Sequence, residues 1–157
     1  MGNKTLDQDR QYQLWWLIRH TRWAMQRARE KELYHYQISN EDSAVLFAVR
    51  TIGDEATPAK ISRFVMREPH TVSGQLDRMV KKGLLTKTKD FEKKNMVRVA
   101  ITEKGQRVYE KAAKRESIHR IMSSISDSDC EHLFECLQTL LNKALKDADI
   151  KSKPGLP

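Results

Sequence analysis

The sequence lacks the features that mark several large classes of protein. Only two of its 157 residues are cysteines, Cys130 and Cys136, so the fold is not expected to depend on a disulfide framework. No apolar run approaches the roughly 18 residues of a membrane-spanning helix. The N-terminus has no signal-peptide core, and Leu6 stands where a myristoylation signal has Ser or Thr. We therefore expect a cytoplasmic protein that does not contact membranes.

Motifs of catalysis are missing as well. The sequence has no P-loop, no dinucleotide-binding fingerprint, no nucleophile elbow and no zincin helix. His132 and Cys136 are one helical turn apart, but Cys130 points elsewhere and no other motif supplies further metal ligands. We therefore expect no catalytic residue, no metal site and no cofactor.

Positive charge is concentrated in the middle of the sequence. Residues 57–105 carry 12 basic and 5 acidic side chains. Residues 1–56 carry 8 of each kind, and residues 106–157 carry 9 basic and 8 acidic side chains. A local excess of this kind is typical of a lobe that binds nucleic-acid phosphates. The alternative is a solvated basic face that has no partner.

The first predicted helix spans residues 10–36 and carries two stripes of side chains, each of which needs a partner surface. One stripe is positioned to meet a partner subunit and comprises Leu14, Ile18, Thr21 and Met25. The second is positioned to meet the rest of its own chain and comprises Trp16, His20, Trp23 and Arg27.

Capping residues predict five further helices. The expected start residues are Ser39, Thr57 before Pro58, Glu68 before Pro69, Thr102 and Ser126. Gly53 and Gly83 are expected to end the first and the third of these helices. The last helix carries apolar residues at helical spacing, namely Leu133, Leu137, Leu140, Leu141 and Leu145.

The helix that begins at Pro69 has two distinct sides. Its inner side gathers Val72, Leu76, Met79 and Val80. Its outer side is polar and basic, and comprises His70, Thr71, Gly74, Arg78 and Lys81. Such groups can hydrogen-bond base edges. The alternatives are that Arg78 pairs with Asp77 or another acid, and that His70 and Thr71 are ordinary first-turn residues.

Two alternating runs, 85–89 and 97–101, flank a polar connection and predict a β-hairpin. Three helices followed by a hairpin with a charged tip is the order of a winged helix-turn-helix. The helix from Pro69 suits the DNA major groove. The preceding helix can meet phosphates through Lys60 and Arg63. The hairpin tip, with Lys93, Lys94 and Asn95, can reach the DNA backbone or the minor groove.

At this point the sequence resembles the MarR family of bacterial winged helix-turn-helix regulators. The resemblance runs from about Thr57 to Gly105 as an ordered set of short motifs. These are Thr71-Val72-Ser73, then Leu76-Asp77-Arg78-Met79-Val80-Lys81-Lys82-Gly83-Leu84-Leu85, then Asp90, then Val99-Ala100-Ile101-Thr102-Glu103-Lys104-Gly105.

The resemblance implies a dimer in which the first and last helices of both subunits interlock. It implies that the helix from Pro69 is the recognition helix, with Thr71, Ser73 and Arg78 at contact positions. It also implies that wing residues aligned with Lys93, Lys94 and Asn95 touch double-stranded operator DNA.

The sequence departs from the family pattern in the wing and in the recognition helix. The wing commonly carries Asp-Arg-Arg or Asp-Lys-Arg, whereas the aligned run here is Lys93-Lys94-Asn95. Lysine lacks the planar fork of arginine, so Lys93 and Lys94 are expected to act as phosphate counter-charges. Gly74 stands where many relatives place a larger polar contact residue.

Many members of the family bind small aromatic acids between the dimerising helices and the winged lobe. An aromatic stripe of Trp16, His20 and Trp23 suits such an effector, and Arg50 is positioned to close the same cleft. The alternative is that the stripe fills the core and the dimer interface.

The sequence thus predicts a mainly α fold with a small β-hairpin wing, dimerising through its N- and C-terminal helices. Residues 1–36 and 106–148 form the dimerisation region, 37–105 the DNA-binding lobe and 149–157 a disordered tail. The expected function is a homodimeric regulator, a repressor of a pseudo-palindromic operator, released by a small aromatic ligand. Two alternatives are a protein–protein interaction module and a thiol-sensing regulator that uses Cys130 and Cys136. Those two cysteines are six apart on one helix and cannot readily bridge each other.

Overall fold

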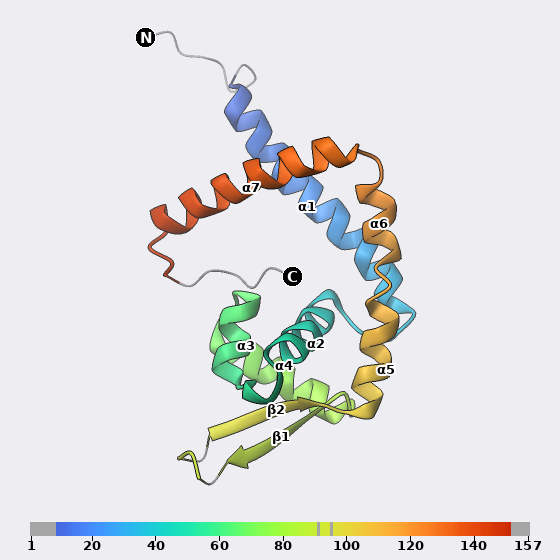
Figure 1. Cartoon of the computed structure of the whole chain (residues 1–157), viewed down its shortest axis with the longest axis vertical. Coiled ribbons are helices and arrows are strands. Elements are labelled where there is room, and N and C mark those ends of the chain that lie inside the picture. Colours follow the sequence, from blue (N-terminus) through green and yellow to red (C-terminus); the bar gives the residue numbers. More distant parts are fainter. Residues whose placement is uncertain (1–8, 91, 95, 152–157) are drawn as a thin grey trace.

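The computed structural model describes residues 9–90, 92–94 and 96–151, which form a helical chain with one β-hairpin (Figure 1). Its elements in order are α1 (Arg10–Tyr34), α2 (Asn40–Ile52), η2 (Gly53–Glu55), α3 (Pro58–Val65), α4 (Pro69–Lys81), β1 (Leu85–Asp90), β2 (Met96–Ile101), α5 (Glu103–Ala112), α6 (Glu116–Met122) and α7 (Asp127–Asp147). The predicted fold class, mainly α with a hairpin wing on a winged helix-turn-helix, is confirmed.

The predicted capping residues begin four of the helices through side-chain hydrogen bonds. Ser39 and Asp42 form a reciprocal capping box at the start of α2. The side chains of Thr57, Thr102 and Ser126 accept hydrogen bonds from backbone amides at the starts of α3, α5 and α7. Glu68 precedes α4 without a capping bond, and Pro69 occupies the first helical turn. These local signals place the helices that carry the candidate site.

The core lies in the lobe formed by α2, α3, α4 and the hairpin. Leu46, Ile61, Leu76 and Met79 are fully buried there, and Leu33 from the end of α1 joins them. The hairpin pairs antiparallel, with Leu85 opposite Ile101 and Asp90 opposite Met96. A bond from Val99 N to Ala56 O at 2.9 Å ties β2 to the segment between α2 and α3. The lobe therefore holds α4 and the wing in one packed unit.

Helix α6 was not predicted from the sequence. Helix α5 ends at Ala112, and Arg115 then adopts a left-handed backbone conformation with φ of 52° before α6 begins. No glycine or proline marks this break. The first amides of α6 are instead capped from outside, because Glu116 N and Ser117 N donate to the carboxylate of Glu32 in α1. A tertiary contact of this kind has no local sequence signal.

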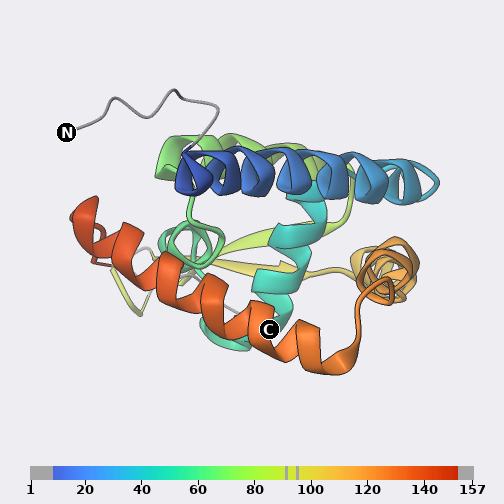
Figure 2. The same cartoon turned by 90° about the horizontal axis from the view of Figure 1, so that it is seen from above.

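Helices α1 and α7 cross in Figure 1, but the view from above in Figure 2 separates them, with α1 and α7 on different sides of the protomer. Apolar side chains on both helices face solvent. They include Leu14, Trp15 and Leu17 of α1, and Leu133, Phe134, Leu137 and Leu140 of α7. Only Leu33 of α1 and Leu145 of α7 are buried among the residues of these helices.

The prediction that the second stripe of α1 packs against its own chain is wrong. Trp16 is 40% exposed and Trp23 is 64% exposed, and His20 is exposed as well. Contacts with the rest of the protomer come instead from the C-terminal half of α1, which packs on α2 and α6. The helical spacing of these side chains is correct, but spacing alone does not show whether the same chain or a partner subunit covers them.

The predicted tail falls largely outside the described residues. Of residues 149–157 the structure describes 149–151. Asp149, with φ of 54°, and Ile150 donate backbone hydrogen bonds to Lys146 O and Leu145 O. These two bonds satisfy carbonyl groups at the C-terminal end of α7.

Candidate nucleic-acid interface and ligand pocket

Helix α4 is held to the lobe by one apolar side. Val72, Leu76 and Met79 have no exposed surface. The helix is closed at its end by Gly83, with φ of 73°, a conformation that suits glycine. This anchoring fixes which residues of α4 face solvent, and it matches the two-sided helix predicted from the sequence.

The outer side of α4 carries the predicted contact residues. His70, Thr71, Ser73 and Arg78 are exposed, and Gly74 is half-buried. Arg78 forms no ion pair with any described residue. Asp77 pairs instead with Lys87 of β1, whose Nζ lies 2.6 Å from Asp77 Oδ1. The alternative in which Arg78 forms an ion pair with Asp77 is therefore not observed. The guanidinium of Arg78 is available to an external anion.

The hydrogen bond from Lys87, with its charge, lowers the pKa of Asp77 below the ordinary value of an aspartate. The carboxylate thus stays ionised beside Arg78, and Lys87 balances its charge. The charge of Lys81 also acts on Asp77, and Arg78 on the outer side of α4 keeps its positive charge without an ion pair to a described residue.

The two predicted contacts on α3 differ in their surroundings. Arg63 is exposed, and no ion pair joins it to a described residue. Lys60 is half-buried and its Nζ lies 3.1 Å from Glu55 Oε2. A phosphate approaching Lys60 would compete with Glu55, whereas a phosphate approaching Arg63 would not.

The wing is braced by an arginine that sequence reasoning missed. Arg98 donates to Asp90 Oδ2 on the facing strand, to Asp54 O and to Glu55 Oε1. Asp90 Oδ1 accepts from the backbone amides of Glu92 and Lys93 at the tip. The pairing of Asp90 with an arginine on the other strand is the signal that could have indicated this brace.

Lys93 and Lys94 are exposed at the wing tip, where Lys94 has φ of 51°. Asn95, the third predicted contact of the wing, lies outside the described residues. The tip thus presents two lysines, and the contacts of Asp90 and Arg98 fix the ends of the strands that carry the tip.

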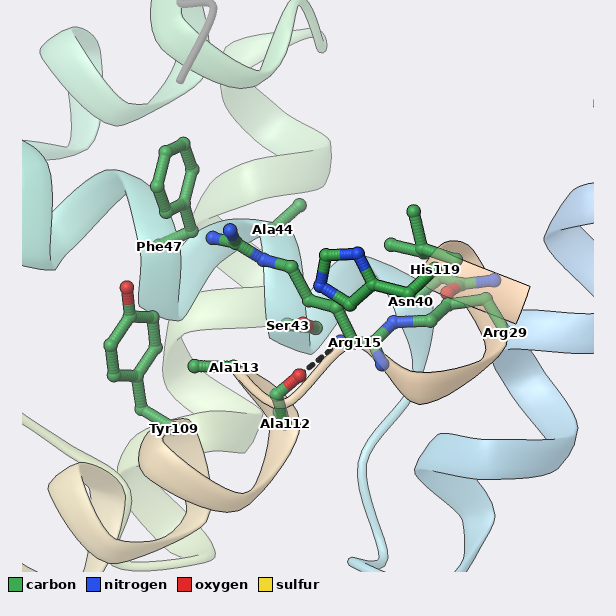
Figure 3. Close-up of a pocket in the computed structure, with 11 residues that line it drawn as sticks. Arg29, Asn40, Ser43, Ala44, Phe47, Tyr109, Ala112, Ala113, Arg115 and His119 are labelled. Carbon is green, nitrogen blue, oxygen red and sulfur yellow. Dashed lines mark hydrogen bonds between the residues drawn. The ribbon is translucent and has the colours of Figure 1, made fainter. Parts of the chain in front are cut away.

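A pocket of about 540 Å³ lies between the winged lobe and α5–α6 (Figure 3). One wall carries Phe47 and Tyr109, and another carries Arg29, Arg115 and His119. The guanidinium of Arg115 lies 5.9 Å from the centre of the Phe47 ring. Aromatic rings beside cationic groups suit a small aromatic ligand that carries negative charge.

A second pocket of about 450 Å³ adjoins the first and shares Arg29, Asn40, Ala44 and Ile118 with it. Its other lining residues come from α1, α2, the end of α3 and α4, where Gln75 contributes. We call the region of these two adjoining pockets, between the long helix α1 and the lobe, the hollow.

Arg29 stands in the shared wall and links three elements. Its Nη2 donates to Ala112 O at the end of α5, a bond drawn in Figure 3. Its Nη1 lies 2.8 Å from Glu32 Oε2 in an ion pair, yet it is buried and makes no hydrogen bond of good geometry.

Glu32 in turn accepts from Ser117 Oγ and from the amides of Glu116 and Ser117. Burial acts to raise the pKa of Glu32, but the hydrogen bonds from Ser117 and the charge of Arg29 in the ion pair outweigh it and lower the pKa to about 2. This cluster joins α1 to the break between α5 and α6.

The predicted effector residues lie elsewhere. None of Trp16, His20, Trp23 and Arg50 lines either of these pockets. Trp16 and His20 do contact each other, with ring centres 5.3 Å apart. Arg50 is exposed on α2. The residues of α1 that line these pockets are Arg22, Met25, Gln26 and Arg29, so a ligand site at Trp16, His20, Trp23 and Arg50 stays a prediction that these pockets do not include.

Other site types were sought in the described part of the chain. No group of three His, Cys, Asp or Glu side chains there is arranged to hold a metal ion. Within the same residues, no helix combines the length and apolar character that crossing a membrane requires. Cys130 is half-buried and Cys136 is exposed, and both are free thiols.

Comparison with known families and structures identifies the lobe. The family described as a winged helix DNA-binding domain matches residues 38–105, a stretch that contains every predicted DNA-contact residue. A search of curated protein sequences finds no match.

Several solved structures share the fold over nearly the whole chain. The organohalide-sensing transcriptional regulator RdhR, bound to 2,4-dichlorophenol, is 31% identical with a TM-score of 0.87, covering 100% of this chain and 95% of that one. CouR from Rhodococcus jostii, bound to p-coumaroyl-CoA, is 19% identical with a TM-score of 0.72 over 88% and 95%. A mutant MarR from E. coli, complexed with operator DNA, is 18% identical with a TM-score of 0.78 over 88% and 99%.

Proposed function

The chain belongs to the MarR family of winged helix-turn-helix transcriptional regulators, and on this basis we propose that it is a homodimeric repressor of a pseudo-palindromic operator, released by a small aromatic ligand. The family consists of DNA-binding transcription factors and not of enzymes. The observation that carries the proposal is the outer side of α4, where Arg78 is exposed and pairs with no described residue, while the inner side is buried in the core.

Recognition rests on α4 lying in the major groove. His70, Thr71, Ser73 and Arg78 face solvent together, and Gly74 lets the backbone approach the DNA closely. An arginine that reads a guanine contributes about 1–3 kcal/mol of discrimination. Arg63, Lys93 and Lys94, with Asn95 as a further wing contact, act on phosphates and fix orientation. Lys60 takes the same role once a phosphate displaces Glu55.

The dimer is supported by apolar surface that the protomer leaves uncovered. Trp15 of α1 is 70% exposed and Phe134 of α7 is 55% exposed, and other exposed apolar side chains lie on the same two helices. A second copy related by two-fold symmetry would cover both. We place the Trp16 and Trp23 stripe in this interface as well. The symmetry sets the recognition helices about 34–36 Å apart, one turn of DNA.

The effector is proposed to occupy the hollow formed by the two pockets between α1, α5–α6 and the lobe. Its residues suit an aromatic anion, and 2,4-dichlorophenol is bound by the 31% identical RdhR. A ligand there favours a dimer whose lobes are wrongly spaced for the operator. Because linkage is reciprocal, operator DNA then weakens ligand binding by the same factor.

The decisive experiment is a fluorescence-anisotropy titration with the DNA upstream of the protein's own gene, with a scrambled duplex as competitor. Wild type should bind with a Kd that resists the competitor, and its affinity should fall with salt at a slope near −0.9 per phosphate contact. Arg78→Ala should weaken specific binding about 10- to 100-fold. Arg107→Ala is the matched control, because it removes the same charge from an exposed position on α5 where Glu103 is the partner.

Equal binding of both duplexes by wild type, or an Arg78→Ala variant as tight as Arg107→Ala, would refute recognition through α4. If wild type bound neither duplex even at low salt, the result would favour a protein–protein interaction module.

A further inference from the structure

The winged lobe is connected to the proposed dimerisation helices by two routes along the chain. One is α1, whose C-terminal half packs on α2 and α6 and whose Leu33 is buried in the core of the lobe. The other runs from α5 through α6 to α7, which turns off at the end of α6 (Figure 1). Among the described residues of α7, Leu145 alone is buried. The direction of α7 relative to the lobe therefore depends on the break between α5 and α6.

The backbone at this break has an unfavourable conformation. Arg115 has φ of 52° and ψ of 36°, the left-handed region that a residue with a Cβ seldom adopts. Its guanidinium lies 5.9 Å from the centre of the Phe47 ring on α2, so the side chain reaches back to the lobe (Figure 3). Such a conformation persists only where the surrounding contacts hold it.

Glu32 of α1 supplies the contacts on one side of the break. Its Oε1 accepts from Glu116 N at 3.1 Å, and its Oε2 accepts from Ser117 N at 3.0 Å. Ser117 Oγ donates to the same Oε2. Glu116 and Ser117 are the first two residues of α6, and the side chain of Arg115 before them makes no capping bond. Glu32 therefore supplies the N-terminal cap that α6 lacks locally.

Arg29, one helical turn before Glu32, holds the other side of the break. Its Nη2 donates at 2.6 Å to the carbonyl of Ala112, the last residue of α5 (Figure 3). Its Nη1 lies 2.8 Å from Glu32 Oε2, and both side chains are 11% exposed. Contacts between charges buried to this extent are little screened by solvent. We call Arg29 and Glu32 the clasp, because together they hold the end of α5 and the start of α6 against one turn of α1.

We propose that Glu32 is a positioning residue that fixes the angle between the winged lobe and α7, and thereby the half-site spacing that the dimer accepts. This inference rests on the proposed function, a homodimer on a pseudo-palindromic operator, and involves no ligand. The two recognition helices must enter major grooves about 34–36 Å apart. A lobe held at one angle meets that spacing without losing freedom, whereas a loosely held lobe loses freedom on binding and also accepts other spacings.

The proposal separates the reading of one half-site from the reading of the spacing. The contacts of Glu32 described above join α1 to α6 and do not involve α4 or the wing. One lobe reads a single half-site, so affinity for an isolated half-site should not depend on the clasp. A smaller fraction of folded protein would instead raise every Kd alike. The ratio of two operator Kd values, measured within each variant, therefore isolates the spacing from stability.

The first test uses full-length protein, fluorescence anisotropy and three duplexes. These are the operator that wild type protects in the DNA upstream of its own gene, the same operator with one base pair inserted at its centre, and a single half-site. The insertion moves the half-sites apart by about 3.4 Å and rotates them by about 35°. In wild type it should raise the Kd about tenfold or more. Glu32→Gln should reduce this ratio to about threefold or less, with a half-site Kd within about twofold of wild type.

Glu30→Gln is the matched control and should keep the wild-type ratio. It makes the same chemical change on α1, where Glu30 pairs with the exposed Arg27. If Glu32→Gln does not fold, Ser117→Ala replaces it, because it removes the hydroxyl donor to Glu32 and keeps both amide contacts. Its ratio should lie below that of wild type. A wild-type ratio in a folded Glu32→Gln variant, or in Ser117→Ala when that variant is the one used, overturns the proposal.

A distance measurement on the dimer without DNA gives a second readout. Arg50 is exposed on α2, so a spin label at Arg50→Cys, with Cys130→Ser and Cys136→Ser, reports the distance between the two lobes by pulsed electron resonance. The distribution of distances should be broader with Glu32→Gln than without it, and unchanged with Glu30→Gln. Equal widths in all three proteins overturn the proposal.

Wild type that binds the operator and tolerates the inserted base pair also overturns this inference, and leaves DNA binding intact. Wild type that binds no operator, or a labelled protein that is monomeric, refutes the proposed function instead. The two failures are therefore distinguishable.

Discussion

The guanidinium of Arg78 lies back over Gly74, one turn earlier on the outer side of α4. A Cβ built on Gly74 would lie 3.8 Å from Arg78 Nη1, an ordinary van der Waals contact. Gly74, where the sequence departs from the family pattern, and Arg78, the proposed contact residue, are therefore in direct proximity on α4. The missing side chain leaves space in which the arginine rests against the helix when no DNA is present.

Gly74→Ala should stabilise the protein. The site is helical, so alanine removes backbone freedom from the unfolded chain at no steric cost, which is worth about 0.5–1 kcal/mol. Urea unfolding at fixed protein concentration measures the change. A loss of stability would show that Arg78 cannot share the space with a methyl group.

Gly105→Ala should be strongly destabilising, by about 3 kcal/mol. A Cβ at this position would lie 2.1 Å from Leu84 O and 2.9 Å from Ile101 Cγ1. Leu84 O cannot withdraw easily, because it accepts the amide of Thr102 at 3.1 Å. Gly53→Ala is the comparison, with φ of 69° but nothing within 4 Å of the new Cβ, and should cost about 1 kcal/mol. Equal losses at the two sites in urea unfolding would contradict the steric argument.

Glu32 should make the stability depend on pH in the acid range. Its pKa is lowered from 4.5 to about 2 in the folded state, so the unfolded chain binds its proton first as the pH falls. The contribution, about 3 kcal/mol, is complete above pH 4.5 and is lost as the pH falls toward 2. Urea unfolding across this range should show the decline.

Glu32→Gln should lower stability at neutral pH and flatten that decline. Glu30→Gln is the matched control on the same helix, since Glu30 pairs with Arg27, whose side chain is 67% exposed. Such an exposed pair contributes at most about 1 kcal/mol. If both variants behaved alike, Glu32 would not be the group that caps α6.

Lys87→Met should weaken operator binding although Lys87 lies on β1, outside α4. The change removes the ion-pair partner of the Asp77 carboxylate, next to Arg78 on the face that we propose meets DNA. We expect a loss of about tenfold at low salt, shrinking as salt screens the repulsion. Lys89→Met removes the same charge two residues along the strand and should cost less. Fluorescence anisotropy at two salt concentrations compares them, and an equal loss would refute the role of Asp77.

Leu137→Glu should convert the dimer into monomer. Leu137 lies within the exposed apolar face of α7, and a carboxylate there would be buried without a partner in the proposed interface. Thr139→Glu, on the other side of the same helix, should leave the dimer intact. Light scattering coupled to size-exclusion chromatography distinguishes the two. A wild-type protein that is monomeric at micromolar concentration would refute the dimer itself.

Much of the fold could be predicted because its signals are local. Ser39, Thr57, Thr102 and Ser126 each cap a helix by bonding amides within three residues, and the two sides of α4 follow from helical geometry alone. The exposure of Arg78 is a consequence of the same periodicity. For these features the residues that decide the outcome are neighbours in the chain.

Other features depend on residues that meet only after folding. Glu32 caps α6 from 84 residues away, and Gln75 reaches Asp42 across 33 residues. The lining of the hollow, with Arg29, Phe47 and Arg115, could not be read from the stripe of Trp16, His20 and Trp23 that first suggested a ligand. Periodicity shows that a stripe will be covered, whereas the packing of α1 on α2 and α6 decides where the cavity lies. The sequence therefore determined the exposed face of α4 and every α-helix but α6. Tertiary packing determined α6 and the hollow, because both depend on surfaces that only folding brings together.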